Sequence, residues 1–247
     1  MSSPPSPQPS PASGRGSKSE SLPGSKAALR VALVGAECTG KTQLAALLAP
    51  RLARDTGLRV AWVPEHLRQW CDQVGRTPLA HEQGSILRAQ HERIEAAAAT
   101  HDIVVCDTTA LMTAVYSRFI FGDRSLEQRA VALQQRMAMT LLMAIDLPWV
   151  ADGQQRDGAH VREPVDTMLR ELLLVHRVPW AVVSGLGAAR LESAVDALAP
   201  LLRPPSRPGS GLFTRLADRQ AEASHLRWAC DCCSVPECER AVHPPRL

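Results

Sequence analysis

The 247-residue chain has no apolar run near the roughly 18 residues that a membrane-spanning helix needs. Residues 1–27 are rich in Ser and Pro and have no apolar core, which argues against a secretory signal peptide. Basic residues form no dense stretch and the net charge is only +3, so nothing in the composition indicates nucleic-acid binding. These absences predict a cytoplasmic protein with no membrane span and no nucleic-acid partner.

Lysine is almost missing, although the chain holds 28 basic residues. Lys18 and Lys26 lie in the N-terminal segment, so Lys41 is the only lysine after it. A compact ammonium and a planar guanidinium are not interchangeable. Lys41 is therefore either a chance survivor of an arginine-rich composition or a position that needs an ammonium, and its surroundings favour the second interpretation.

The seven cysteines do not show the spacing of a disulfide framework, and their odd number without an export signal argues against one. Thiolates suit tetrahedral Zn²⁺, and four of the cysteines crowd the C-terminus: Cys230, Cys232, Cys233 and Cys238. Their Cys-x-Cys-Cys-x₄-Cys spacing differs from the usual paired Cys-x₂-Cys pattern. Three interpretations stay open: a zinc site, a docked or redox-active tail without metal, and a partner-binding segment.

Composition divides the chain into four segments. Residues 1–27 are expected to be a disordered tail, 28–202 a globular domain, 203–211 a Pro/Gly linker and 212–247 a Cys-rich appendage. Within the domain, short continuous apolar runs alternate with helical periodicity, which indicates strands that are covered on both faces. This predicts an α/β fold with a doubly wound, parallel five-stranded sheet and helices on both faces.

The expected strands are 29–34, 59–63, 103–106, 141–145 and 180–183. The expected helices are 41–53, 79–100, 110–121, 126–137, 165–177 and 191–202. Pro50 lies inside the first helical pattern and is expected to kink that helix or end it early, because proline lacks the N–H that a helix interior uses.

A phosphate-binding motif follows the first expected strand. Residues 35–42, Gly-Ala-Glu-Cys-Thr-Gly-Lys-Thr, match Gly-x₄-Gly-Lys-[Ser/Thr] and lie between a strand and a helix, as the mechanism requires. The glycines let backbone N–H groups turn toward a phosphate, and the helix N-terminus adds positive potential. Lys41 is expected to contact the β- and γ-phosphates and Thr42 to hold Mg²⁺. The predicted ATP-binding residues are Gly35, Glu37, Cys38, Thr39, Gly40, Lys41 and Thr42.

Two carboxylates end or follow neighbouring strands. Asp107 ends the third strand, close to the phosphate loop in a doubly wound sheet, and is a candidate Mg²⁺ ligand. Its alternative role is to cap the next helix, which Thr108 and Thr109 can do instead. Glu65 follows the second strand and suits a base for an acceptor hydroxyl, or is an exposed residue favoured by a helix dipole. Arg68 follows at a spacing that can line the same pocket.

A polar segment with two glycines, residues 152–162, separates the fourth strand from the next helix. Such a segment is typical of a lid that closes over phosphates, with Arg156 and Arg162 as candidate catalytic arginines. The alternative is a solvated loop with incidental arginines. Trp149 is expected either to stack on a substrate ring or to pack in the core.

Four blocks occur in the order found in one known family: the loop 35–42, Pro64-Glu65, Cys106-Asp107-Thr108 and the Trp-Val-Ala-Asp-Gly stretch 149–153. Over about residues 29–202 they resemble the ribosylnicotinamide kinase domain of the NadR type. The resemblance implies a P-loop kinase fold and ATP-dependent phosphorylation of nicotinamide riboside in NAD biosynthesis. It implies ATP and Mg²⁺ at Lys41, Thr42 and Asp107, Glu65 near the acceptor, Arg156 in the lid and Gln90 on a helix that faces the site. The predicted substrate-binding residues are Glu65, Arg68, Gln90, Trp149 and Asp152.

The chain departs from that family in two respects. The family often has Asp-Thr-Asp where this chain has Asp107-Thr108-Thr109, so one carboxylate is missing. NadR itself also carries a DNA-binding helix-turn-helix and an adenylyltransferase domain, and neither fits in the residues before the first expected strand. Operator binding and adenylyl transfer are therefore not implied.

The predicted function is transfer of the ATP γ-phosphoryl group to a primary hydroxyl of a nucleoside-like small molecule, with nicotinamide riboside as the leading candidate. The first alternative is a kinase for another nucleoside or a vitamin. The second is a nucleotide-dependent regulatory ATPase that hydrolyses slowly and has no small-molecule acceptor. The chain has no Asn-Lys-x-Asp stretch of the sort that reads guanine, which favours ATP.

Overall fold

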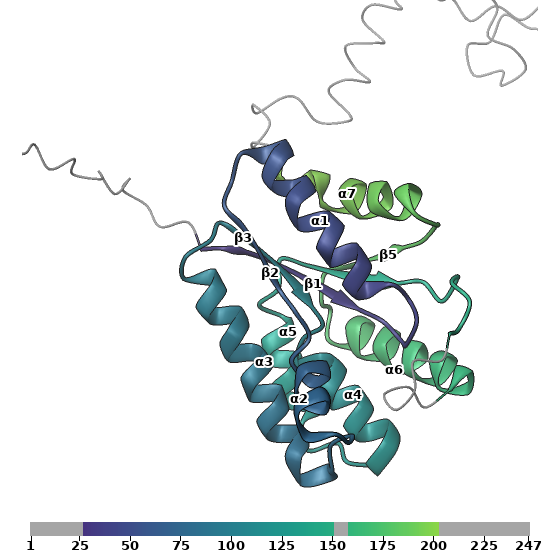
Figure 1. Ribbon diagram of the computed structural model, residues 1–247. Helices are drawn as coiled ribbons and strands as arrows, with labels where there is room; N and C mark the ends of the chain where they lie inside the picture. The colour runs from purple at the N-terminus through teal and green to yellow at the C-terminus, as the bar shows by residue number, and fades with distance from the viewer. Residues whose placement is uncertain (1–26, 151–157, 203–247) are drawn as a thin grey trace, which may run out of the picture.

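The computed structural model describes residues 27–150 and 158–202 (Figure 1). The strands are β1 (Leu29–Val34), β2 (Val60–Val63), β3 (Ile103–Asp107), β4 (Met139–Met143) and β5 (Trp180–Val183). The α-helices are α1 (Lys41–Thr56), α2 (His66–Val74), α3 (Gln83–Ala98), α4 (Ala110–Phe121), α5 (Glu127–Gln134), α6 (Arg162–Val175) and α7 (Ala188–Leu202). Short 3₁₀ turns, η1 (Ala80–Glu82) and η2 (Ala159–Val161), precede α3 and α6.

The five strands form one sheet in the order β2-β3-β1-β4-β5, and every pairing is parallel. This confirms the α/β fold of the P-loop type with a doubly wound sheet. The register pairs Leu33 with Asp107 across β1 and β3, so the ends of these two strands lie side by side. Since the phosphate-binding motif follows β1, this register brings Asp107 next to it.

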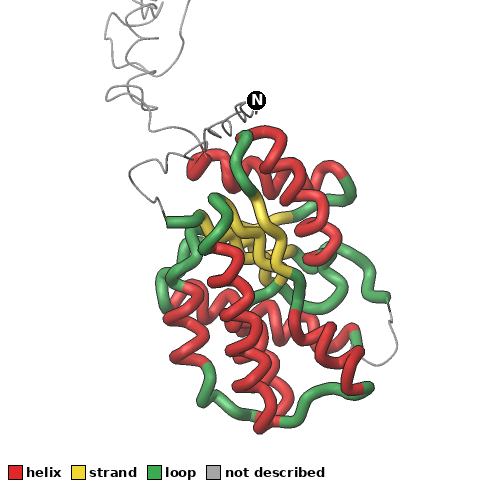
Figure 2. Tube along the Cα trace, turned by 60° about the vertical axis from the view of Figure 1, so that its left-hand side comes forward, coloured by secondary structure: helices red, strands yellow, loops and turns green. Residues whose placement is uncertain are grey.

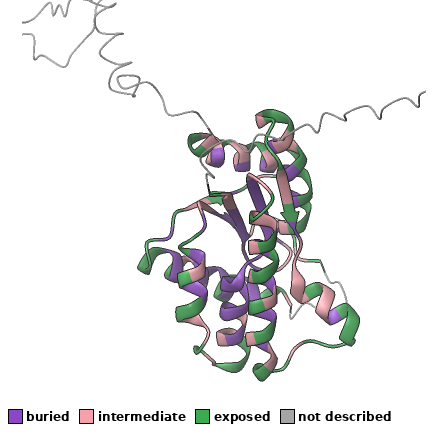
Figure 3. Ribbon diagram, turned by 90° about the vertical axis from the view of Figure 1, so that its left-hand side faces the viewer, coloured by how far each residue is buried: buried purple, intermediate pink, exposed green. Residues whose placement is uncertain are grey.

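Alternate residues of each central strand serve two separate cores. Val31 and Leu33 of β1 pack with α1 and α7, whereas Ala32 and Val34 pack with α4 and α6 on the opposite face. Figure 2 shows the strands enclosed between these helical layers, and Figure 3 shows the strands and the inward helix faces as the buried part of the molecule. Covered faces explain why the strands read as continuous apolar runs.

Most of the expected elements are present, with shifted ends. The expectation that Pro50 ends the first helix early is wrong, because α1 continues to Thr56. Pro50 and Ala46, whose carbonyl loses a helical partner, are both solvent-exposed, so water can satisfy the free carbonyl. The fourth strand lies two residues before its expected position, and α2 was not expected at all.

Several predicted features lie outside the described residues. They include the N-terminal tail, the linker and the Cys-rich appendage. Six of the predicted site residues also lie there: Asp152, Arg156, Cys230, Cys232, Cys233 and Cys238. Within residues 27–150 and 158–202, no cluster of side chains has the composition of a metal site built from three or more His, Cys, Asp or Glu. In the same ranges, no helix combines the length and apolar character that a membrane crossing requires.

Candidate nucleotide-binding and phosphotransfer site

The turn between β1 and α1 has backbone geometry that requires glycine. Gly35 has φ 150°, and a Cβ there would lie 2.9 Å from Cβ of Met143. Gly40 has φ 77° and caps the N-terminus of α1. Cys38 also has a positive φ, of 55°, which is strained for a residue with a side chain. The loop therefore turns back on itself and presents backbone N–H groups near the start of a 16-residue helix.

Lys41 is the first residue of α1 and its ammonium reaches back over the loop. Nζ donates hydrogen bonds to the carbonyls of Gly35 at 2.8 Å and Ala36 at 2.9 Å. Burial lowers the pKa of Lys41, and the nearby carboxylates of Glu65 and Asp107 partly oppose that shift. An ammonium has three N–H donors, so one remains to meet an anion in the cavity.

Asp107 ends β3 directly beside the loop, and the N–H of Thr108 donates to the carbonyl of Leu33 at 3.1 Å. The carboxylate is only 1% exposed, and no described residue forms a well-aligned hydrogen bond to either oxygen. Burial raises the pKa of Asp107, while the nearby Thr42 hydroxyl and the Lys41 ammonium act to lower it. A buried carboxylate without partners is costly to ionise, so this position favours a cationic ligand.

The helix cap after β3 is Thr109, not Asp107. Thr109 Oγ1 accepts a hydrogen bond from the N–H of Leu111 and donates one to Oε1 of Gln134 at 2.6 Å. Gln134 Nε2 in turn donates to Oγ1 of Thr140 at 2.8 Å, and all three side chains are buried. The position where the NadR type often has a second aspartate thus serves a structural network here, and Asp107 stays available to the loop.

Glu65 occupies the N-cap position of α2, immediately after β2. Its side chain is 20% exposed and lies 3.8 Å from Nε of Arg68, one turn further along α2. Burial raises the pKa of Glu65, Asp107 raises it further, and Lys41 and Arg68 act to lower it. A carboxyl group with a raised pKa in a cavity is a candidate for proton exchange with a bound molecule.

Three carboxyl groups lie close enough to act on the pKa of Lys41, those of Glu37, Glu65 and Asp107, and the Arg68 guanidinium acts on it in the opposite sense. Carboxylate oxygens are the ligands that a divalent cation accompanying a nucleotide prefers.

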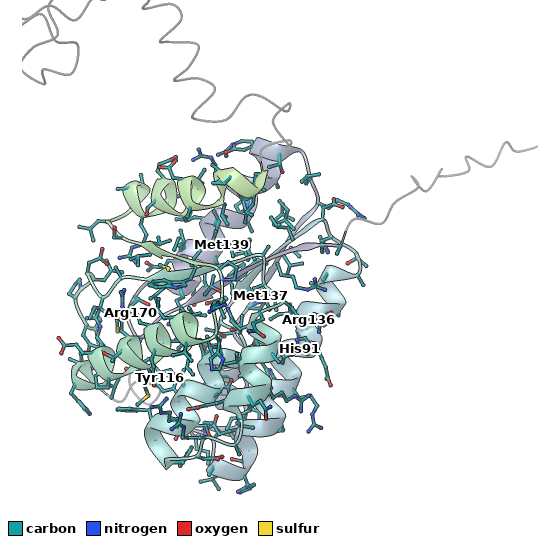
Figure 4. The ribbon with its side chains drawn as sticks, turned by 180° about the vertical axis from the view of Figure 1, so that it is seen from behind. His91, Tyr116, Arg136, Met137, Met139 and Arg170 are labelled. Atoms are coloured by element: carbon teal, nitrogen blue, oxygen red, sulfur yellow. The ribbon has the colours of Figure 1, made fainter. Side chains whose placement is uncertain are left out.

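A cavity of about 790 Å³ opens in front of the loop. Its polar end is lined by the loop itself, Glu65 and Arg68. Its other end is largely apolar and uses one face of α4, where Met112, Tyr116 and Ile120 recur at intervals of four residues. Tyr116, which lines the cavity, is labelled among the helices in Figure 4.

Gln90 bridges the segments that carry the two central carboxylates. The N–H of His66, next to Glu65, donates to Oε1 of Gln90 at 2.7 Å. Nε2 of Gln90 lies 3.5 Å from the carbonyl of Thr108, next to Asp107. Gln90 is 2% exposed and borders a small void of about 10 Å³ beside Glu65. Its amide therefore holds backbone on both sides of the site.

Two other predicted residues lie apart from the cavity lining. Arg162, expected at the end of the polar segment before the next helix, is the first residue of α6 and is 9% exposed. Among the described residues, none meets Nε or Nη2 of Arg162 or the indole N–H of Trp149 with a hydrogen bond. Val150, which does line the cavity, contacts the loop: Cys38 Sγ donates to its carbonyl at 3.2 Å.

Sequence reasoning missed Arg190 of α7, which supports the loop from behind. This buried guanidinium donates from Nη1 to the carbonyl of Thr39 at 2.9 Å and from Nε to that of Gly185 at 2.8 Å. It also pairs with Asp146, which follows β4. Arg190 lies 149 positions after Lys41 in a helix with ordinary periodicity, so only the folded chain brings it to the loop.

Comparison with protein families places the chain in a known group. A family model described as an AAA domain matches residues 30–190, which is more than half of the chain and contains the loop, Glu65 and Asp107. The chain belongs to this AAA domain family. No curated protein sequence matches it significantly.

Two solved structures of NadR share the fold of this AAA domain protein. The complex of NadR with NAD and AMP-PNP has a TM-score of 0.55 at 19% identity, over 73% of this chain and 51% of NadR. The complex of NadR with NR has a TM-score of 0.58 at 18% identity, over 73% of this chain and 52% of NadR. The likeness therefore spans about half the length of NadR, and it shows a common fold.

A thymidylate kinase from Ehrlichia chaffeensis has the same fold. Its TM-score is 0.52 at 14% identity, over 71% of this chain and 100% of the kinase. The described residues thus share their fold with NadR and with a thymidylate kinase. At these identities the acceptor does not follow from the likeness.

Proposed function

We propose that the protein transfers the γ-phosphoryl group of ATP to a primary hydroxyl of a nucleoside-like small molecule, with nicotinamide riboside as the leading acceptor. The observation that carries the proposal is the position of Glu65. Its carboxyl group lines the same cavity as Lys41, and burial raises its pKa. A carboxyl group with a raised pKa that borders a cavity of small-molecule size is suited to take the proton of an acceptor hydroxyl.

The loop supplies the phosphate contacts. Backbone N–H groups around Gly35–Gly40 and the N-terminus of α1 attract the phosphates, and Lys41 meets the charge that develops on the transferred group. Arg190 holds the loop carbonyl of Thr39, so the loop keeps its shape when it takes up an anion. We assign the ATP contacts to residues 35–42 on this basis.

Asp107 and the hydroxyl of Thr42 are the residues that would hold magnesium. The fit rests on the two buried Asp107 oxygens, which lack well-aligned partners among the described residues, and on the nearby Thr42 hydroxyl. Bound there, magnesium would neutralise charge between the β- and γ-phosphates. The cysteine cluster lies outside the described residues, and neither the described residues nor the comparisons support zinc.

Glu65 acts on the acceptor. Its carboxylate takes the proton of the hydroxyl while the acceptor oxygen forms the new bond to phosphorus, and the bond from phosphorus to the oxygen of ADP breaks. Arg68 lies on the same side of the cavity and can meet the transferring phosphoryl group. The lid roles of Arg156 and Arg162 and the substrate contacts of Trp149 and Asp152 remain predictions.

The likeness to NadR in complex with NR supports nicotinamide riboside as the first acceptor to test. The likeness to a thymidylate kinase favours a second candidate, a pyrimidine nucleoside or its monophosphate. Both candidates place a ring in the apolar end of the cavity and an oxygen acceptor near Glu65, so the same assay decides between them.

The test is ADP formation from ATP and Mg²⁺ with nicotinamide riboside, common ribo- and deoxyribonucleosides, thymidylate, thiamine or no acceptor. Strong stimulation by one compound, abolished in Lys41→Ala, is the expected result and names the acceptor. Slow ADP formation that no compound accelerates would contradict the proposal and favour a nucleotide-dependent regulatory ATPase.

A further inference from the structure

The apolar end of the cavity contains one buried amide. Gln83 is the first residue of α3, its side chain is 3% exposed, and it lines the cavity. Within the described part of the chain, Oε1 of Gln83 has no hydrogen-bond partner. Leaving such a group unpaired costs about 1–3 kcal/mol, so an amide in this position calls for a ligand that pairs with it.

The cavity lining around Gln83 is largely apolar and includes residues such as Leu67, Leu79, Met112 and Tyr116. The described lining residues that carry charge are Glu37 in the loop, Lys41 at the start of α1, Glu65 before α2 and Arg68 on α2. A carboxylate that enters beside the apolar residues would lose hydration and find no cationic side chain among them.

We propose that Gln83 determines acceptor specificity by pairing with a neutral hydrogen-bonding edge, a carboxamide or an imide, and that the cavity rejects a carboxylate at that place. This inference rests on the proposed function, because it assumes that the cavity binds the compound that accepts the phosphoryl group. A primary amide carries both a donor and an acceptor, so it can form two reciprocal hydrogen bonds with a carboxamide or an imide.

A carboxylate presents acceptors alone and cannot satisfy Oε1 of Gln83. The ionised group would also bring a full charge into the apolar end. Sites that pair buried polar groups with a substrate reject analogues that leave those groups unpaired, and this is the basis of the expected selectivity.

The test measures binding by calorimetry, with the full chain saturated with a non-hydrolysable ATP analogue and Mg²⁺. Two matched pairs of compounds are compared: nicotinamide riboside with nicotinic acid riboside, and uridine with orotidine. In at least one pair the carboxamide or imide compound should bind tenfold or more tightly than its carboxylate analogue, roughly the discrimination of one buried polar pairing. Gln83→Met should reduce that preference to less than about threefold. Gln73→Met, an exposed position on α2, is the matched control and should keep it.

Three results would overturn the proposal: equal or tighter binding of the carboxylate in both pairs, an unchanged preference in Gln83→Met, or no binding of any of the four compounds. Gln83→Glu provides a second variant that keeps the side-chain size. It should weaken the binding of nicotinamide riboside and uridine without strengthening the binding of the two carboxylate compounds. Failure of the proposed function would give a different result. The compounds would still bind with a preference that depends on Gln83, but no ADP would form from ATP in the presence of the bound compound.

Discussion

The two ends of the cavity are built in different ways. The phosphate end lies where β1, β2 and β3 stop at one edge of the sheet, and it combines buried charge with positive-φ backbone at Gly35, Cys38, Gly40 and Thr108. The acceptor end is formed by α2, α3 and α4 in regular helical geometry with apolar side chains. Backbone strain and buried charge are thus concentrated at the proposed phosphate end, and in our proposal the other end discriminates between acceptors by shape and by Gln83.

The strongest way to break this division is to remove the ammonium at the phosphate end. Lys41→Ala should lower the rate of ADP formation by roughly a hundredfold or more, because a preorganised charge contact to the transferred group is lost. Lys41→Arg should not restore the rate, since a planar guanidinium cannot repeat the contacts of Nζ with Gly35 and Ala36. Near-full activity in Lys41→Ala would contradict the assignment of the loop.

Glu65→Gln tests whether the carboxylate between the two ends is a base. Turnover should fall by about a hundredfold while the affinity for ATP changes little. Because burial raises the pKa of Glu65, wild-type activity should begin to fall on acidification at a higher pH than an ordinary glutamate would allow. A pH-rate profile checks this, and an equal loss of turnover and ATP affinity would indicate a structural role.

The same substitution has an opposite effect on stability. A raised pKa means that the folded state binds the Glu65 proton more tightly than the unfolded chain does, so the ionised group destabilises the fold at pH 7. Glu65→Gln should therefore raise the melting temperature at pH 7. The gain should shrink as the pH falls from the raised pKa to that of an ordinary glutamate. A lower melting temperature at pH 7 would contradict this account.

Gln90→Met sharpens the comparison, because this side chain links the backbone beside Glu65 to the backbone beside Asp107. Losing it leaves the N–H of His66 buried without its partner, and unfolding free energy should fall by about 1–3 kcal/mol. If Gln90 acts through position, turnover falls and the KM for the acceptor stays within a few-fold. A large change in that KM alone, measured in the ADP assay, would indicate direct substrate contact.

The smallest effect is expected at the acceptor end. Ile120 lies on α4, lines the cavity and is 49% exposed, so Ile120→Ser removes apolar contact with little damage to the core. The KM for the acceptor should rise by roughly three- to tenfold, the value of part of one aliphatic side chain, and the KM for ATP should not change. Leu174→Ser, at an exposed position on α6, is the control.

The sequence predicts the phosphate end of the cavity better than the other end. The loop, Asp107 and Glu65 are each recognisable because they lie at the ends of apolar runs, where a parallel sheet gathers its functional side chains. Gln83 and Arg190 were missed, since a glutamine or arginine in a helix has no distinguishing neighbours. Arg162 was placed in a polar segment although its side chain is buried, because local polarity does not show which helix packs against it.

The sequence by itself determined the parallel α/β fold, the strand-loop-helix that binds phosphate and the two carboxylates beside it. These features can be predicted because hydrophobic periodicity, glycine conformation and the ends of strands depend on residues that are close together in the sequence. Only the tertiary structure decided that Thr109 caps α4, that Gln90 joins two segments and that Gln83 lies unpaired in the apolar end. Such contacts depend on packing between residues distant in the chain, which no local pattern records.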